Sequence, residues 1–302
     1  MKILITGATG FLGKIMVEHL AKIYDVATLG RYDAQYISDL SINIPQFSKS
    51  FDRVIHAAGL AHVFGSASKN HELFNKVNVQ GTVNLFKGLQ KLEMLPKEFV
   101  FISSVAVYGK KQGVLLSEDN ELKATDPYGY SKIQAETVVQ DWCEKHQVKC
   151  IILRLPLIVG DNAPGNLGKM VEAIKKNRYF TIGDGHAAKS MVLGSDVAKL
   201  MAQKELSQGI YNLTDGTNPT FAQLENVLVN KFKSRGPIRL PYFIARALGY
   251  FGDIIVKFLN PNFPFSSDVF KKITSDLTFD DSHAKNKLNW SPSKVLEFYV
   301  NN

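Results

Sequence analysis

The chain has 302 residues, of which 45% are hydrophobic and 21% are charged, and its formal net charge is +8. This composition excludes collagenous, coiled-coil and disordered chains. The two cysteines, Cys143 and Cys150, are too few for a disulfide framework or a four-ligand zinc site. They fit a reducing compartment, so we expect a cytoplasmic protein.

The first half of the chain alternates short β-rich runs with helical patterns. We expect strands at 2–6, 25–29, 53–58, 99–105 and 148–155, and helices at 11–23, 72–92 and 128–145. Strands that alternate with helices of ten or more residues form βαβ units on a parallel sheet. The strands are apolar without alternation, which indicates that helices cover both faces. The predicted fold is therefore an α/β, Rossmann-like, doubly wound parallel sheet.

After Gly160 the pattern becomes irregular, because turn clusters such as DNAPGN and TDGTNP separate shorter elements. We therefore divide the chain into a dinucleotide-binding domain at 1–160 and a smaller, irregular α/β substrate domain at 161–302. Some segments of the second part are expected to return to the sheet of the first.

The most apolar stretch runs from Leu240 to Leu259. Arg246, Asp253 and Lys257 interrupt it, so it is not a transmembrane segment. Large apolar residues at helical spacing favour a buried amphipathic helix. The alternative is a helix on an anionic membrane surface, because six basic residues and one acid lie between Lys231 and Lys257.

A glycine-rich turn, TGATGFLG, occupies residues 6–13 between the first strand and the first helix. Glycines at 7, 10 and 13 permit a tight turn, close approach of a pyrophosphate and close packing of helix on strand. The amino end of the helix attracts the anion. We therefore predict a dinucleotide site that includes Gly7, Gly10, Phe11, Leu12 and Gly13.

Arg31 follows the second strand, where an acidic residue would usually bind a free ribose 2′-hydroxyl. An arginine can pair with a 2′-phosphate instead, so the sequence favours NADP over NAD. Asp33 lies nearby, and a solvated surface arginine is the alternative.

Tyr128 and Lys132 are four residues apart at the start of a predicted helix, so they share a face. An ammonium near a phenol is expected to lower the tyrosine pKa and make Tyr128 a proton donor or acceptor near neutral pH. Ser104 lies at the carboxyl end of a strand, the edge where ligands of open α/β sheets bind. Its hydroxyl could donate to a carbonyl or alkoxide.

The motifs TGxxGxxG, a serine before VYG, and YxxxK, in this order and spacing, resemble the extended short-chain dehydrogenase/reductase family, also described as NAD-dependent epimerases and dehydratases. The resemblance covers nearly the whole chain. It implies that Tyr128 exchanges the proton, that Lys132 orients it and holds the nicotinamide ribose, and that Ser104 polarises the sugar carbonyl.

The same resemblance implies further contacts. Those to the cofactor are Asp39 and Leu40 beside the adenine, the HAAG segment with Ala57, Ala58 and Gly59, and Asn78, Tyr128, Lys132 and Pro156. Those to the nucleotide sugar are Ser104, Asn166, Leu167 and Lys189, with Lys189 as a point charge for the pyrophosphate.

Departures from the family patterns help to choose an activity. Dehydratases carry an Asp-Glu pair where this chain has Val105 and Ala106, so elimination lacks its acid and base. Hexose 4-epimerases usually show an RYFN-like run where residues 154–157 read RLPL. The RLPLIVG, GNL and KSMV runs are more similar to bacterial reductases of UDP-2-acetamido-2,6-dideoxy-4-hexulose, which serve surface polysaccharide synthesis.

We therefore expect an NADP(H)-dependent oxidoreductase that reduces C4 of a UDP-linked 4-keto-6-deoxy sugar. The alternatives are a UDP-hexose or N-acetylhexosamine 4-epimerase with retained NAD, and a non-catalytic dinucleotide-binding sensor or scaffold.

Other partners follow from what the sequence lacks and from the resemblance. No block of like charges and no basic stripe with aromatics is present, so no nucleic acid is expected. No histidine, cysteine or acid shows metal-ligand spacing, which predicts no metal site. The resemblance implies a homodimer built from the helical faces at 75–92 and 128–142.

Overall fold

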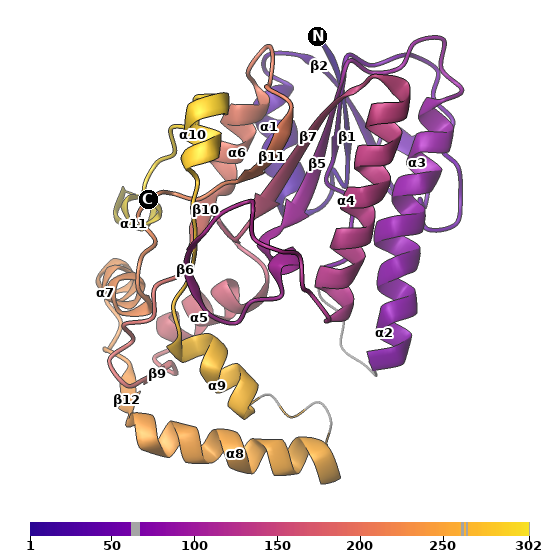
Figure 1. Cartoon of the computed structure of the whole chain (residues 1–302). Helices are drawn as coiled ribbons and strands as arrows, with labels where there is room; N and C mark the ends of the chain where they lie inside the picture. The colour runs from indigo at the N-terminus through magenta and orange to yellow at the C-terminus, as the bar shows by residue number, and fades with distance from the viewer. Residues whose placement is uncertain (62–66, 261–262, 264, 302) are drawn as a thin grey trace.

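The computed structural model describes residues 1–61, 67–260, 263 and 265–301 (Figure 1). Seven strands of this described chain form one parallel sheet in the order β11-β7-β5-β4-β1-β2-β3. They are β1 (Lys2–Thr6), β2 (Asp25–Gly30), β3 (Tyr36–Ile37), β4 (Arg53–His56), β5 (Glu98–Ser104), β7 (Lys149–Leu155) and β11 (Gly209–Asn212). The predicted fold class is confirmed.

Helices cover both faces of this sheet. Alternate residues of β1 show why the strands are apolar throughout: Ile3 and Ile5 pack with α1 (Phe11–Leu20) and α6 (Gly194–Met201), whereas Leu4 faces α3 and α4. On that second face α3 spans Gly81–Leu89 and α4 spans Pro127–His146. Since side chains alternate along a strand, a sheet covered twice needs an unbroken apolar run.

The second half of the chain, together with one strand at residues 113–116 from the first half, forms a smaller unit of mostly short elements. These are α5 (Gly165–Lys175), α7 (Phe221–Phe232), α8 (Tyr242–Phe258), α9 (Ser267–Thr274), α10 (Ser282–Leu288) and α11 (Val295–Asn301), with the parallel pairs β8 (Leu157–Val159) and β10 (Met191–Leu193), β9 (Phe180–Ile182) and β12 (Ile238–Leu240), and β6 (Gly113–Leu116) and β13 (Leu277–Phe279). Both β11 and α6 lie in the layers of the large sheet, and the domain boundary at residue 160 stays a prediction.

The long helix expected at 72–92 consists of three consecutive segments. α2 (Ala67–Phe74) continues into a π-helical turn, η1 (Asn75–Gln80), and then into α3. The wider π turn contains Asn78, which is buried. Such turns often occur at functional sites. This one places the Asn78 amide against Leu60, which follows β4, and Ser131 on the predicted catalytic helix.

The helix expected in the stretch from Leu240 to Leu259 forms as α8, but the expectation that it is buried is wrong. Its buried residues are the small ones, Ala245, Gly249 and Gly252. Phe243 and Phe258 are 73% and 72% exposed. The spacing predicted a helix, but it could not show which face packs against the rest of the chain.

A buried ion pair joins β4 to β5, and further hydrogen bonds from the same arginine join β4 to the carboxyl end of α6. Arg53 is completely buried, and its Nε donates to the Glu98 carboxylate at 2.6 Å. The same guanidinium donates to the backbone carbonyls of residues 201, 203 and 204. All of its charge is therefore compensated inside the protein, as a buried cation requires.

A chain of hydrogen bonds crosses the sheet at the end of β1 and β4. The Thr82 hydroxyl donates to the Asn78 carbonyl, so it accepts from His56 Nε2 at 3.0 Å. His56 Nδ1 is then an acceptor for the Thr6 hydroxyl at 2.6 Å, and that oxygen accepts from the Ala58 backbone N–H. The direction of these bonds assigns a neutral imidazole with its proton on Nε2.

This arrangement makes His56 a source of acid sensitivity. Burial lowers its pKa from 6.5 to about 3, with a smaller contribution from the charge of Lys132. The folded state therefore binds fewer protons than the unfolded state between these values, and stability is lost as the pH falls through them.

We predict that the free energy of unfolding falls on acidification from pH 7 toward pH 4, with a slope from His56 of up to about 1.4 kcal/mol per pH unit. His56→Gln should be less stable at neutral pH and should show a flatter pH dependence, measured by denaturant unfolding. The control is His186→Gln, at an exposed histidine. Parallel pH curves for the wild type and His56→Gln would contradict this assignment.

Candidate active site

The three glycines of the glycine-rich turn do not all have the same structural role. Gly7 has φ +69°, and a Cβ there would approach the backbone of Ala57 and Ala58 to 2.7 Å. A Cβ at Gly13 would collide with the Gly7 carbonyl. Beside Gly10, by contrast, the nearest atom to a Cβ is the Gly7 carbonyl oxygen at 3.2 Å. Two glycines thus close the turn, and the third leaves its outer side open.

The amino end of α1 adjoins this open side. Its N-cap, Gly10, supplies no side-chain cap, and its first turn contains no acidic residue. The free N–H groups and the helix dipole together favour an anion. The turn and the helix therefore fit the pyrophosphate of a dinucleotide, with Phe11 and Leu12 in the first turn.

Arg31 directly follows β2, and Asp39 follows β3, near enough for the charge of Arg31 to act on the Asp39 carboxylate. Arg31 is exposed. A hydrogen bond from Ser41 lowers the pKa of Asp39, and the charge of Arg31 lowers it further. Leu40 is buried, with its carbonyl bound by the Asn84 amide. An arginine and a carboxylate are thus both available to the adenosine part of a cofactor.

The three predicted catalytic side chains converge at the carboxyl end of β5. Ser104 ends this strand and caps a short 3-10 helix, η2 (Val105–Tyr108), by accepting from the Ala106 N–H. Tyr128 lies in the first turn of α4, behind the N-cap Asp126, and hydrogen-bonds to Ser104. Lys132 lies one turn further along α4.

Lys132 contacts the sheet itself. Its Nζ donates to the Ile102 carbonyl at 2.9 Å and lies 4.6 Å from the centroid of the Phe101 ring. Burial lowers the pKa of Lys132 to about 8. The buried ammonium thus fixes α4 against β5 while it carries one donor to the sheet and two more for other acceptors.

The expectation that Lys132 lowers the pKa of Tyr128 is wrong for this structure. Burial raises the pKa of Tyr128 above 10, the Ser104 hydrogen bond opposes that rise, and the charge of Asp126 adds to it. Because desolvation disfavours the phenolate more than the neighbours stabilise it, the phenol is protonated at neutral pH. Tyr128 is therefore set to donate a proton.

The remaining predicted cofactor residues gather around Lys132. A Cβ at Gly59 would lie 3.4 Å from Lys132 Nζ and 3.2 Å from Asn78 Oδ1. The Asn78 amide binds both backbone groups of Leu60 and donates to Ser131. The segment with Ala57, Ala58 and Gly59 is therefore held beside Lys132.

The predicted substrate residues have different environments. Asn166 is exposed at the start of α5, and Leu167 is buried in the core of the second unit. Pro156, which was predicted as a cofactor contact, is partly exposed directly after β7. Lys189 is mostly buried, and its Nζ donates to the carbonyls of Lys272 and Ser275. Its ammonium thus holds the end of α9, and its contact with a pyrophosphate stays a prediction.

The residues that support this site from behind were not found from the sequence. Glu136 on α4 pairs with the Arg154 guanidinium on β7 and accepts from Ser103. Arg154 also donates to Tyr108, whose hydroxyl donates to Asn212 on β11. This buried network fixes the strand ends that carry Ser104. No local spacing signals it, because its members come from different elements.

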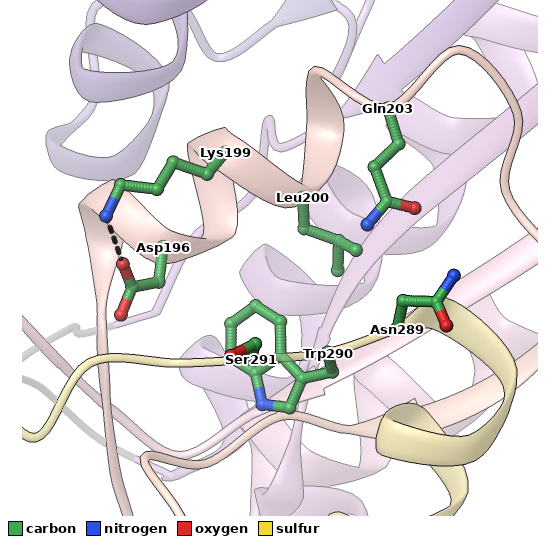
Figure 2. Close-up of a pocket in the computed structure, with 7 residues that line it drawn as sticks. All are labelled: Asp196, Lys199, Leu200, Gln203, Asn289, Trp290 and Ser291. Atoms are coloured by element: carbon green, nitrogen blue, oxygen red, sulfur yellow. Dashed lines mark hydrogen bonds and ion pairs between the residues drawn. The ribbon is translucent and has the colours of Figure 1, made fainter.

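Two cavities lie outside the catalytic group. The pocket in Figure 2, about 100 Å³ between α6 and the segment after α10, has Asp196 bound to Lys199 and Ser293. A pocket of this size is too small for a nucleotide sugar. A larger cavity of about 560 Å³ includes Phe11 and Gly160 beside the glycine-rich turn.

No group of three or more histidine, cysteine or acidic side chains within the described residues could hold a metal ion. Of the histidines considered in the sequence, His62 lies outside the described residues. No helix of the described chain is long and apolar enough to cross a bilayer.

Comparisons with known proteins match the whole architecture. The model of the NAD dependent epimerase/dehydratase family matches residues 3–213. An N-acetyl-alpha-D-glucosaminyl-diphospho-ditrans,octacis-undecaprenol 4-epimerase from Escherichia coli O157:H7 is 28% identical, over 92% of this chain and 87% of the relative. A UDP-glucose 4-epimerase from Vibrio cholerae is 26% identical, over 98% of this chain and 92% of the relative.

A solved structure agrees with these relatives at the level of the fold. The UDP-glucuronic acid 4-epimerase from Bacillus cereus, in complex with UDP-glucuronic acid and NAD, superposes with a TM-score of 0.74 at 18% identity, over 100% of this chain and 97% of that one. The family model covers the glycine-rich turn and all three predicted catalytic side chains. The chain therefore belongs to the NAD dependent epimerase/dehydratase family and is an enzyme of the extended short-chain dehydrogenase/reductase type.

Proposed function

We propose that the protein is a 4-epimerase of a UDP-linked hexose or N-acetylhexosamine that retains its NAD. The observation that carries this proposal is the convergence of Ser104, Tyr128 and Lys132 at the sheet edge beside the glycine-rich turn. The relatives from Escherichia coli O157:H7 and Vibrio cholerae, which span most of this chain, are both 4-epimerases.

The chain's own residues account for the proton chemistry. A bound NAD, which the glycine-rich turn and Lys132 would hold, would supply the hydride acceptor for C4 of the sugar and the donor that returns the hydride. Ser104 and Tyr128 lie within one hydrogen bond of each other, so both can contact the same C4 oxygen. The C4 hydroxyl proton passes to Tyr128 in its phenolate form as the 4-keto sugar forms, and the resulting phenol, the form that burial favours, gives the proton back afterwards. Ser104 stabilises the oxygen as its charge changes.

The reductase interpretation, which the sequence favoured, rested partly on the RLPL run at residues 154–157. Arg154 is buried in its ion pair with Glu136, and because the RYFN-like run of 4-epimerases also begins with arginine, this residue does not distinguish the two activities. Reduction of a 4-keto-6-deoxy sugar by NADPH for polysaccharide synthesis stays the second candidate. It uses the same three side chains in one direction only.

The preference for NAD follows from the charge beside the adenosine site. Asp39 keeps a lowered pKa, mainly through a hydrogen bond from Ser41, so its carboxylate is charged and disfavours the negative 2′-phosphate of NADP. An epimerase also regenerates its bound NAD in every turnover, so it does not need to exchange the cofactor for NADPH from solution.

A second candidate substrate is an N-acetylhexosamine on a polyprenyl diphosphate, as in the name of the Escherichia coli O157:H7 relative. It presents the same C4 hydroxyl and the same diphosphate to the site. The cytoplasmic location and the homodimer through the faces of α3 and α4 stay predictions.

We predict that purified protein interconverts UDP-N-acetylglucosamine and UDP-N-acetylgalactosamine without added reductant, measured by NMR at equilibrium. Tyr128→Phe should lower kcat by about 100-fold or more, because the proton donor is lost. The variant should keep its affinity for NAD, measured by fluorescence titration. Near-normal turnover by Tyr128→Phe would refute the role of the phenol. Consumption of NADPH with a UDP-linked 4-keto-6-deoxy sugar, and no epimerisation, would favour the reductase instead.

We also predict that the wild type binds NAD more tightly than NADP, measured by calorimetry with each cofactor. Arg31→Ala should leave the affinity for NAD within about threefold, because an exposed charge contributes little to a neutral ribose edge. Asp39→Asn should shift the preference toward NADP, because it removes the negative charge that a 2′-phosphate would meet. Tighter binding of NADP by the wild type, lost in Arg31→Ala, would restore the sequence-based assignment of NADP.

A further inference from the structure

The helix α8 buries its smallest residues and exposes its largest apolar side chains. Its inner face consists of the small residues Ala245, Gly249 and Gly252, which are buried. A Cβ at Gly249 would already lie 3.2 Å from the backbone of Ser267 on α9. The helix thus packs closely with its smallest side chains, and this packing leaves its largest ones outside.

Those outer side chains form one continuous line, here called the apolar stripe. Its members follow the helical repeat at i, i+4, i+8, i+11 and i+15, and all are exposed: Phe243, Ala247, Phe251, Ile254 and Phe258. Phe243 is 73% exposed, Phe251 60% and Phe258 72%. Aromatic residues exposed in a row on one helix mark an interaction surface, because a solvated helix face is normally polar.

The position of α8 leaves this stripe uncovered by the described chain. Figure 1 shows α8 as the outermost element at the bottom of the view, with α9 next to it on the inner side. The contacts of its inner side go to α9: Tyr242 packs edge-on against Phe270 at 4.9 Å, and the Asp253 carboxylate accepts from the Ser267 N–H. With about 1.5 Å per residue, its 17 residues extend over about 25 Å.

The charges around the stripe are nearly all positive. Arg246 and Lys257 flank one edge of it, and each lies over an aromatic ring, Tyr250 at 5.8 Å and Phe258 at 5.2 Å. The acid of this helix, Asp253, faces α9 instead. Basic side chains beside exposed aromatics are the composition of helices that lie in the headgroup region of a membrane.

We propose that α8 binds the surface of an anionic lipid bilayer, with the apolar stripe in the headgroup boundary and with Arg246 and Lys257 on lipid phosphates. Charge complementarity selects this occupant, because two copies of this face would bring like charges together. At 17 residues with two basic side chains and an acid, the helix lies on a bilayer and does not span one.

The proposed orientation brings the active site toward the bilayer. The strands of the large sheet run away from the amino terminus, so their carboxyl ends point to the side on which α8 lies (Figure 1). This inference goes beyond the proposed function and does not depend on it. If both hold, the enzyme works beside a membrane, where diphosphate-linked sugars on lipid carriers are accessible.

The test is flotation of the full-length protein with vesicles of phosphatidylcholine alone or mixed with phosphatidylglycerol, at low and high salt. We expect binding to the mixed vesicles that weakens with salt. Phe251→Ser/Phe258→Ser should weaken it by about tenfold or more. Arg246→Gln/Lys257→Gln should abolish the preference for the anionic lipid. The matched control, Ile23→Ser/Met94→Ser, changes side chains that are 53% and 67% exposed on other parts of the surface and should bind like the wild type.

The readouts separate this proposal from the proposed function. All four proteins should convert a soluble UDP-sugar at the same rate, because none of these residues belongs to the active site. Absence of wild-type protein from the floated mixed vesicles at low salt would overturn the proposal, whatever the turnover. So would a concentration-dependent dimer, seen by light scattering, that Phe251→Ser/Phe258→Ser dissociates while vesicle binding is absent. That result would assign the stripe to a second copy of the chain.

Discussion

The direction of the strands is the constraint on which the rest of the structure depends. All strands of the large sheet are parallel, so each must be followed by a crossover, and every strand delivers its carboxyl end to the same edge. The glycine-rich turn after β1, the segment after β4 and Ser104 at the end of β5 become neighbours for this reason. Helix α4 then adds Tyr128 and Lys132, because the buried Lys132 ammonium needs an acceptor and finds the Ile102 carbonyl.

Much of this site could be predicted because its signals are local. Gly7, Gly10 and Gly13 lie within seven residues, and the turn requires glycine at 7 and 13, where a Cβ would meet backbone atoms. Tyr128 and Lys132 are one helical turn apart, so their shared face follows from the repeat alone. The alternation of strands and helices likewise predicted the doubly wound sheet. In each case the information lies within a few residues of the chain.

The properties that could not be predicted depend on contacts between distant segments. The pKa of Tyr128 is raised because neighbouring elements bury the phenol, and no spacing in the sequence reveals that burial. The role of Arg154 likewise depends on Glu136, which pairs with it from another element. For α8 the sequence indicated a helix with a strong apolar face, but it could not show whether the small or the large apolar residues would be buried. Close packing on α9 selected the glycines.

The buried guanidinium of Arg53 has a consequence for synthesis of the chain. Its partners are the Glu98 carboxylate and the carbonyls of residues 201, 203 and 204. The three carbonyls leave the ribosome long after β4. A nascent chain that ends near residue 160 carries this cation without those carbonyls, and water must solvate it. The amino-terminal half therefore cannot bury Arg53 with all its partners until α6 has been synthesised, so we expect this part of the core to form late in synthesis.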